Sequence, residues 1–229
     1  MPSERIPTRY VRFWLLAAGI SLALAAVLAA VIFYREQDKP FGFELEWMNA
    51  VARHRGDVLT AVALGFNAVG GGWIGVVLVP IVVVVALLLL RRPWAALYSV
   101  VAAAGTAAVV QLLKQLLGRA RPEDILVTSD YGSFPSGHSA NAAALAVVLG
   151  FVFARAWVWA AGAVYTVAMM LSRTYLGAHW ISDTVGGLLV GAGVAIVAWC
   201  LLAPRMESEV RRRREVSGSG TGSAAPPAR

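Results

Sequence analysis

Three short polar clusters interrupt an otherwise apolar sequence, and they contain the side chains that are able to do chemistry. Two of them lie in a basic segment, residues 114–138, and the third lies in residues 172–183. The candidate site residues are Lys114, Arg121, Ser136, Gly137, His138, Arg173, His179 and Asp183. Cations that face a helix N-terminus bind multiply charged anions, above all phosphate. If the clusters meet in the fold, they predict a phosphoryl-transfer site.

The first requirement of such a site is a set of donors around the phosphate oxygens. Lys114, Arg121 and Arg173 can supply positive charge, and the two arginines offer paired donors in a fork. The hydroxyl of Ser136 and the backbone N–H groups near Gly137 can complete the cradle, because glycine lets backbone approach a ligand closely.

The two histidines of these clusters suit different roles. Asp183 lies one helical turn after His179, so its carboxylate can hold one ring nitrogen as a donor and leave the other as a nucleophile. His138 has no carboxylate close in sequence and stands at a predicted helix start, which suits a general acid. We therefore expect a phosphohistidine on His179, hydrolysed by water that His138 activates.

Each cluster alone also has a structural interpretation. The basic residues could be ordinary charges beside a membrane span, Pro-Ser-Gly-His only a helix start, and the histidine–aspartate pair a plain hydrogen bond. A zinc site with His138, His179 and Asp183 as ligands is another alternative. The neighbouring cations disfavour it, since fixed positive charges repel a divalent metal. A non-enzymatic membrane protein that binds lipid phosphates also stays open.

The composition indicates a membrane protein. Of the 229 residues, 59% are hydrophobic and 14% are charged, whereas soluble domains are about half apolar and about a quarter charged. The net charge of +7 does not indicate a nucleic-acid partner, because most of the excess flanks apolar runs, where basic residues set topology. The single cysteine, Cys200, excludes an intramolecular disulfide.

The apolar runs predict an all-α fold, an integral membrane bundle of six transmembrane helices. The predicted spans are residues 13–34, 73–90, 94–115, 136–154, 157–175 and 180–202. Two longer uncharged runs are divided, because one straight helix over either would measure about 50 Å against a hydrocarbon core of about 30 Å. A secretory signal peptide is the rival for the first run, but its apolar core would be only about 7–15 residues long.

Two segments lie outside these spans. Residues 44–57 mix charged and apolar side chains at helical spacing, which predicts an amphipathic helix at the membrane interface. We assign residues 58–67 to the same interfacial segment. The membrane domain is expected over residues 1–203, followed by a basic cytoplasmic tail, residues 204–229, that is predicted to be disordered because it cannot build a core.

The charge distribution predicts the orientation in the plasma membrane. Six spans place both termini on one side and the three polar clusters together on the other. Once the candidate site cations are set aside, basic residues concentrate on the side of the termini, so we expect cytoplasmic termini and an extracytoplasmic site. Small residues of the last span could mediate an oligomer or pack within the bundle, and the oligomeric state stays open. These residues are Gly186, Gly187, Gly191 and Gly193.

The three motifs together resemble those of a known family. In chain order they read Lys114-x6-Arg121-Pro122, Pro135-Ser136-Gly137-His138 and Ser172-Arg173-x5-His179-x3-Asp183. This pattern resembles the type 2 phosphatidic acid phosphatases, membrane lipid phosphatases that are related to vanadium-dependent haloperoxidases and bacterial acid phosphatases. No signature position departs from it. Arg119 lies outside the pattern and is expected to be an auxiliary or lipid-facing charge.

The resemblance implies an enzyme that acts on a lipid phosphate or diphosphate without a metal or other cofactor. It assigns phosphate binding to Lys114, Arg121, Ser136, Gly137 and Arg173, acid catalysis to His138, nucleophilic attack to His179 and its orientation to Asp183. A polyprenyl (undecaprenyl-type) diphosphate is the preferred substrate, because an outward-facing site suits recycling of a lipid carrier. Phosphatidic acid and phosphatidylglycerol phosphate are the alternatives.

Overall fold

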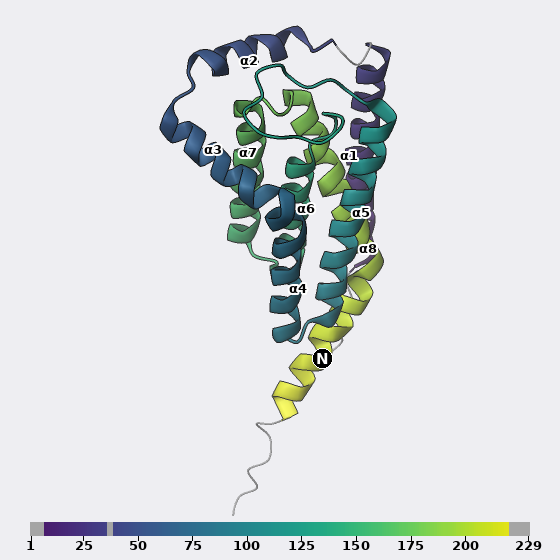
Figure 1. Cartoon of the computed structure of the whole chain (residues 1–229). Helices are drawn as coiled ribbons and strands as arrows, with labels where there is room; N and C mark the ends of the chain where they lie inside the picture. Colours follow the sequence, from purple (N-terminus) through teal and green to yellow (C-terminus); the bar gives the residue numbers. More distant parts are fainter. Residues whose placement is uncertain (1–6, 36–38, 220–229) are drawn as a thin grey trace, which may run out of the picture.

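Long apolar runs form the helices of this chain, and glycine and proline divide them. A computed structural model describes residues 7–35 and 39–219, and all regular structure in these ranges is helical, as predicted (Figure 1). The elements are α1 Thr8–Tyr34, α2 Gly42–Arg53, α3 Asp57–Gly70, the π-helical segment η1 Ile74–Leu78, α4 Val79–Leu89, α5 Pro93–Leu117, α6 Gly137–Phe153, α7 Ala156–Tyr175 and α8 Ile181–Ser219. Pro93 opens α5 and Gly118, with φ of 58°, ends it.

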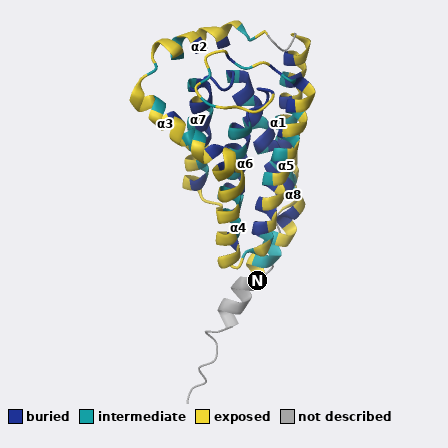
Figure 2. Cartoon of the chain, in the orientation of Figure 1, coloured by how far each residue is buried: buried dark blue, intermediate teal, exposed yellow. Residues whose placement is uncertain are grey.

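Helices α6 and α8 form the centre of the bundle, with α1, α5 and α7 packed around them. Figure 2 shows buried residues gathered on the inward faces of these helices. Small residues allow the close approach, because a Cβ on Gly187 would overlap the carbonyl oxygen of Ser136, and one on Gly191 that of Ala140. These glycines of α8 therefore pack within the bundle, which was one of the two uses considered for them.

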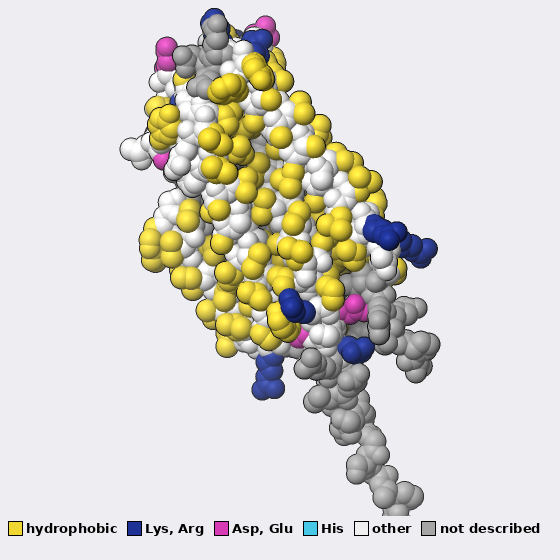
Figure 3. Space-filling view, turned by 90° about the vertical axis from the view of Figure 1, so that its right-hand side faces the viewer, with side chains coloured by type: hydrophobic (Ala, Val, Ile, Leu, Met, Phe, Trp, Pro, Cys, Tyr) yellow, Lys and Arg dark blue, Asp and Glu magenta, His cyan; other side chains and the backbone are white. Residues whose placement is uncertain are grey.

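Three helices are long and apolar enough to cross a membrane: α1, α5, and α8 over residues 181–211. Helix α3 and the η1–α4 segment make a fourth candidate, a pair bent by 45°, while α6 is a shorter apolar helix. The described residues thus contain three or four candidate spans by this measure, and the six-span count stays a prediction. The face shown in Figure 3 is covered by hydrophobic side chains, with charged ones mainly toward its two ends.

The predicted interfacial segment is divided into two helices. Helix α2 lies across the end of the bundle opposite the start of α1 (Figure 1). Residues 58–67 do not continue it, because the chain turns at residues 54–56 and α3 packs against α7. The backbone N–H of Gly56 donates to the Tyr175 hydroxyl at 3.0 Å and holds this turn on α7. Residues 58–67 therefore belong to a helix of their own, and their place at the membrane interface stays a prediction.

Helix α8 also continues beyond the end that the sequence predicts. It passes Pro204 and extends to Ser219, so residues 204–219 are helical rather than disordered, and residues 220–229 lie outside the described residues. Contacts with the start of α5 hold the first turns of this extension, up to residue 209. The Glu209 carboxylate accepts a hydrogen bond from the backbone N–H of Trp94 at 2.9 Å, and the Arg205 guanidinium lies 5.0 Å from the centroid of the Trp94 ring.

The two ends of the bundle differ in what they carry. The start of α1 and the last turns of α8 lie at one end, where α4 also turns into α5 (Figure 1). The other end carries α2, the long loop between α5 and α6, and the turn between α7 and α8. All three polar clusters belong to that second end.

Candidate active site

The loop of residues 118–136 folds back over the end of the bundle and brings the first cluster inward. Gly132, with φ of 70°, lets the loop pass directly against the backbone of Lys114. The backbone N–H of Ser133 donates to the carbonyl oxygen of Arg119 at 2.9 Å and closes the loop. As a result Lys114 is only 3% exposed, although it lies in the last turn of α5.

Lys114 and Arg121 converge on one carboxylate. Nζ of Lys114 and Nη2 of Arg121 each lie 2.8 Å from Oδ1 of Asp130. Burial raises the pKa of the Asp130 carboxyl, but the hydrogen bond and charge of Lys114, with the charge of Arg121, outweigh it and hold the pKa below its usual value. An ionised carboxylate thus lies between two of the predicted phosphate ligands.

Asp130→Asn is expected to tighten the binding of inorganic phosphate by about 5-fold, the effect of removing an exposed ion pair worth up to about 1 kcal/mol. The side chain of Asp130 is 58% exposed, so it competes with phosphate for the two cations rather than sealing them. Calorimetric titration with phosphate checks this. Asp124→Asn, an exposed change in the same loop, is the control, and unchanged phosphate affinity in Asp130→Asn contradicts the expectation.

The second cluster forms the start of α6. Ser136 is the N-cap residue, and its Oγ accepts from the backbone N–H of Ser139 at 3.4 Å. The backbone N–H of Ser136 donates to the carbonyl oxygen of Asp183 at 2.9 Å, which joins the second cluster to the third. A Cβ on Gly137 would meet Val110 at an ordinary 3.7 Å, so packing does not require glycine there. The predicted close approach of the Gly137 backbone to phosphate remains a reason for glycine at this position.

His179 lies in the turn between α7 and α8, which Gly177 opens with φ of 68°. Its Nε2 lies 3.3 Å from Nη1 of Arg121. Because an arginine can only donate, Nε2 is the acceptor, and the neutral ring then carries its proton on Nδ1. Nδ1 faces Oδ2 of Asp183 at 3.6 Å. The unprotonated Nε2 is therefore the nitrogen on the side of Arg121, where a phosphate bound by that cation would meet it.

The charge state of His179 follows from its surroundings. The residue is only 2% exposed. Burial, followed by the positive charges of Arg121 and Arg173, lowers the pKa of the imidazole well below its usual value. The ring is therefore neutral at neutral pH, and its lone pair is available for attack.

Asn67 of α3 links His138 to Arg173. Its carbonyl oxygen lies 3.2 Å from Nε2 of His138, and its side-chain oxygen accepts from Nη1 of Arg173. Nε of Arg173 is buried without a hydrogen-bond partner. Asn67 is not among the candidate site residues that the sequence predicts. A polar side chain inside an uncharged run of a membrane protein is the signal that would have identified it.

Gly71→Ala is expected to lower kcat about 10- to 100-fold, the size seen when a support of a reacting group is lost. A Cβ on Gly71 would overlap Nε2 and Cε1 of His138 and displace that ring from Asn67. Phosphate release measured beside a Gly65→Ala control tests this, because a Cβ on Gly65 meets nothing within 4 Å. Equal rates in the two variants contradict it.

Arg119 is not the lipid-facing charge that the sequence allowed. It is 2% exposed and donates to Asp183 Oδ1 at 2.6 Å and to Glu44 Oε2 at 2.8 Å. The lipid-facing alternative is therefore wrong, because two buried carboxylates draw the guanidinium inward. Glu44 was not singled out from the sequence at all. Nothing in its local context distinguishes it from the other charged residues of α2.

The zinc alternative finds no support in the donor geometry. Among the side chains that the structure describes, in residues 7–35 and 39–211, no three of His, Cys, Asp or Glu are grouped closely enough to hold a metal ion. Both carboxylate oxygens of Asp183 are occupied by other donors, Oδ1 by Arg119 and Oδ2 by the backbone N–H of Trp180 at 2.8 Å.

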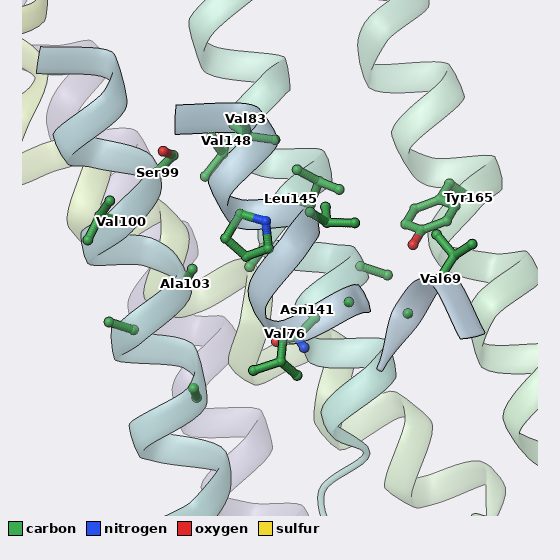
Figure 4. A pocket seen from close by; sticks show the side chains of 18 residues that line it. Val69, Val76, Val83, Ser99, Val100, Ala103, Asn141, Leu145, Val148 and Tyr165 are labelled. Carbon is green, nitrogen blue, oxygen red and sulfur yellow. The ribbon is translucent and has the colours of Figure 1, made fainter. Parts of the chain in front are cut away.

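An apolar cavity of about 290 Å³ lies beside the site, between α3, η1, α4, α5 and α6 (Figure 4). Its wall is mainly aliphatic, and the only polar side chains that line it are Ser99, Asn141 and Tyr165. Gly70 forms part of the cavity wall, and it lies against His138, because a Cβ on Gly70 would be 3.2 Å from Cδ2 of that ring. A chain of apolar groups could therefore lie next to the predicted general acid.

Comparison with known proteins identifies the family of this chain. A family model described as the PAP2 superfamily matches residues 94–207. Decaprenylphosphoryl-5-phosphoribose phosphatase from Mycobacterium tuberculosis is 32% identical over 147 residues, which cover 61% of this chain and 78% of the relative. The chain belongs to the PAP2 superfamily. This PAP2 protein is also 34% identical to phosphatidylglycerophosphatase B from Bacillus subtilis over 91 residues, which cover 35% of this chain and 45% of that protein.

Solved structures of PAP2 proteins share the fold. A transmembrane PAP2 type phosphatidylglycerolphosphate phosphatase from Bacillus subtilis has a TM-score of 0.69 and 24% identity, covering 79% of this chain and 93% of the other. LpxE from Aquifex aeolicus has a TM-score of 0.61 and 25% identity, covering 69% and 95%. The chain spans about half or less of the length of the first curated relatives it matches.

Proposed function

We propose that this PAP2 protein is an integral membrane lipid phosphatase that hydrolyses a phosphomonoester or a diphosphate on a lipid through a phosphohistidine, without a metal. The contact between Arg121 and Nε2 of His179 carries the proposal. It puts a neutral nucleophile beside a cation that can hold phosphate oxygens. Lys114, Arg121 and Arg173 lie near enough to act on the imidazole electrostatically.

In the first step, the Nε2 lone pair of His179 attacks phosphorus while the bond from phosphorus to the leaving oxygen breaks. His138, protonated when the substrate is bound, donates its proton to that oxygen and becomes neutral, and Asp183 stabilises the positive charge that develops on the His179 ring. The three cations neutralise the equatorial oxygens. A phosphate oxygen would also give the buried Nε of Arg173 the hydrogen-bond partner it lacks.

In the second step, water attacks the phosphohistidine and the bond between phosphorus and Nε2 breaks. His138, now deprotonated, takes the proton of the water, which returns both histidines to their starting states. Inorganic phosphate leaves from the cationic pocket. The ionised Asp130 between Lys114 and Arg121 can replace it there.

A lipid substrate is supported by the apolar cavity beside His138, which suits a hydrocarbon chain next to the reacting phosphate. We propose a polyprenyl diphosphate as the substrate. Relatives named for polyprenyl-linked phosphates include the mycobacterial phosphatase and undecaprenyl-diphosphatase from Sulfolobus acidocaldarius, 34% identical over 70 residues. Phosphatidic acid and phosphatidylglycerol phosphate are the alternatives, and phosphatidylglycerophosphatase B supports the second of them.

We also propose the topology expected from the charge distribution, with six spans, cytoplasmic termini and an extracytoplasmic site in the plasma membrane. The separation of the chain ends from the polar clusters along the bundle supports it. In this orientation the site meets lipid headgroups on the outer leaflet, where a used diphosphate carrier would be presented.

The test is phosphate release by the purified full chain from undecaprenyl diphosphate, phosphatidic acid and phosphatidylglycerol phosphate, each with a chelator present. We expect release that the chelator does not reduce, fastest with the polyprenyl diphosphate. Faster turnover of a glycerolipid overturns the substrate preference alone. Activity lost to the chelator supports the zinc alternative. Release no faster than from a His179→Ala variant leaves the lipid-phosphate-binding alternative as the better account.

A further inference from the structure

The interfacial helix α2 contributes a buried carboxylate to the support of the site. Glu44 is fully buried. Its Oε1 accepts from the backbone N–H of Ser182 at 2.9 Å and from the Ser182 hydroxyl. Its Oε2 accepts from Nη2 of Arg119 at 2.8 Å and from the backbone N–H of Phe41 at 2.9 Å. Donors from three separate segments therefore meet on one side chain.

Arg119 joins this carboxylate to a second one. Its Nη1 donates to Oδ1 of Asp183 at 2.6 Å and to the hydroxyl of Ser182 at 2.7 Å. The guanidinium, 2% exposed, is thus held between Glu44 and Asp183. Charge-assisted bonds from a planar guanidinium set the orientation of both partners.

The position and tautomer of the His179 ring depend on the orientation of the Asp183 carboxylate. Oδ1 of Asp183 is held by Arg119, while Oδ2 accepts from the backbone N–H of Trp180 and faces Nδ1 of His179 at 3.6 Å. Turning the carboxylate away from the imidazole would break the bond to Arg119 and leave buried charges unpaired, which is strongly unfavourable. Arg119 therefore keeps Oδ2 directed at the ring.

We propose that Glu44 and Arg119 are positioning residues for the phosphoryl transfer: they hold Asp183 against His179, and the docking of α2 through Glu44 completes the site. This inference rests on the proposed function. The network joins residues that are 75 and 64 positions apart, so it forms only when α2 lies on the bundle. Helix α2 is also outside residues 94–207, which the family model covers.

The experiment compares kcat and KM for phosphate release from a short-chain lipid phosphate in Glu44→Gln, Asp183→Asn and the double variant, all as full chains. A glutamine amide cannot accept at both ends, so the bridge to Arg119 or Ser182 is lost. We expect Glu44→Gln to lower kcat about 10- to 100-fold with KM changed less than about 2-fold. Asp183→Asn is expected to lower kcat about 10⁴-fold.

The double variant separates positioning from mere structural support. If Glu44 acts through Asp183, adding Glu44→Gln to Asp183→Asn changes kcat by less than about 3-fold, because the two effects are not additive. The same fold loss in both backgrounds, or wild-type kcat in Glu44→Gln, overturns the inference. Glu46→Gln, an exposed change on the same helix, is the matched control and should keep wild-type kcat.

A second variant, Arg119→Lys, tests the inference if the Glu44→Gln protein does not fold. Arg119→Lys keeps the charge but cannot bond both carboxylates at once. It should lower kcat with KM nearly unchanged, and wild-type kcat in a folded Arg119→Lys protein overturns the inference. Absence of phosphate release by the wild type overturns the proposed function itself. If the wild type releases phosphate and only Asp183→Asn lowers kcat, the positioning role of Glu44 and Arg119 is overturned while the proposed function stands.

Discussion

Replacing His179 by alanine is expected to lower kcat for phosphate release by about 10⁵-fold or more, the scale on which a nucleophile contributes. The substitution removes the only imidazole whose Nε2 contacts Arg121 in the described residues. The cations remain, so substrate should still bind with little change in affinity. Rates from a lipid phosphate labelled on the transferred group give the measurement.

The phosphohistidine provides a second readout of the same variant. Quenching the wild type during turnover should leave labelled phosphate on the protein, stable in base and lost in acid, as a phosphorus–nitrogen bond requires. His179→Ala should carry no label. His54, the third histidine of the chain, is the exposed C-cap residue of α2, and His54→Ala should behave like the wild type. Label retained without His179 would contradict the assignment.

Arg121→Ala is expected to lower kcat/KM by about 10³- to 10⁵-fold, the range for an arginine that stabilises a phosphoryl-transfer transition state. Its Nη1 donates to the carbonyl oxygen of Ala178 at 2.6 Å and contacts His179, while Nη2 reaches Asp130. The variant therefore loses charge at the phosphate and the alignment of the nucleophile together. Steady-state kinetics with a lipid phosphate measure the loss of kcat/KM. A melting curve shows whether the variant is still folded.

Two further variants sharpen that result. Arg121→Lys keeps one charge but loses the planar fork, so its kcat/KM should fall between alanine and wild type. Arg155→Ala removes an exposed arginine at the turn between α6 and α7 and should leave kinetics unchanged. Wild-type kinetics in Arg121→Ala, with correct folding, would show that this arginine does not hold the phosphate.

The motif residues could be found from the sequence because their chemistry is local. The spacing of His179 and Asp183 predicts that their side chains lie close together, and they are 3.6 Å apart, although His179 lies in the turn before α8 and not on the helix. Ser136 was expected near an N-cap and occupies it. Helix positions followed from apolar runs, since the length and polarity of each run decide where a helix can lie.

Other features depended on contacts that no local pattern encodes. Glu44 and Asn67 reach the site from α2 and α3, over 138 residues to Ser182 and 106 residues to Arg173. Beyond Pro204, helix α8 is held on the bundle by Glu209, which reaches the start of α5. Such partners are brought together only by the packing of the helices. The local sequence around one residue therefore does not predict which distant residue it contacts.

The sequence by itself thus determined the membrane class and the all-α fold, because composition and run length decide these, and its short spacings predicted which residues carry the reactive groups. Only the tertiary structure decided how Arg119 turns inward between Glu44 and Asp183, how Asn67 joins His138 to Arg173, and where α3 lies. Buried charges need partners from distant segments, and only the folded chain shows which partners they find.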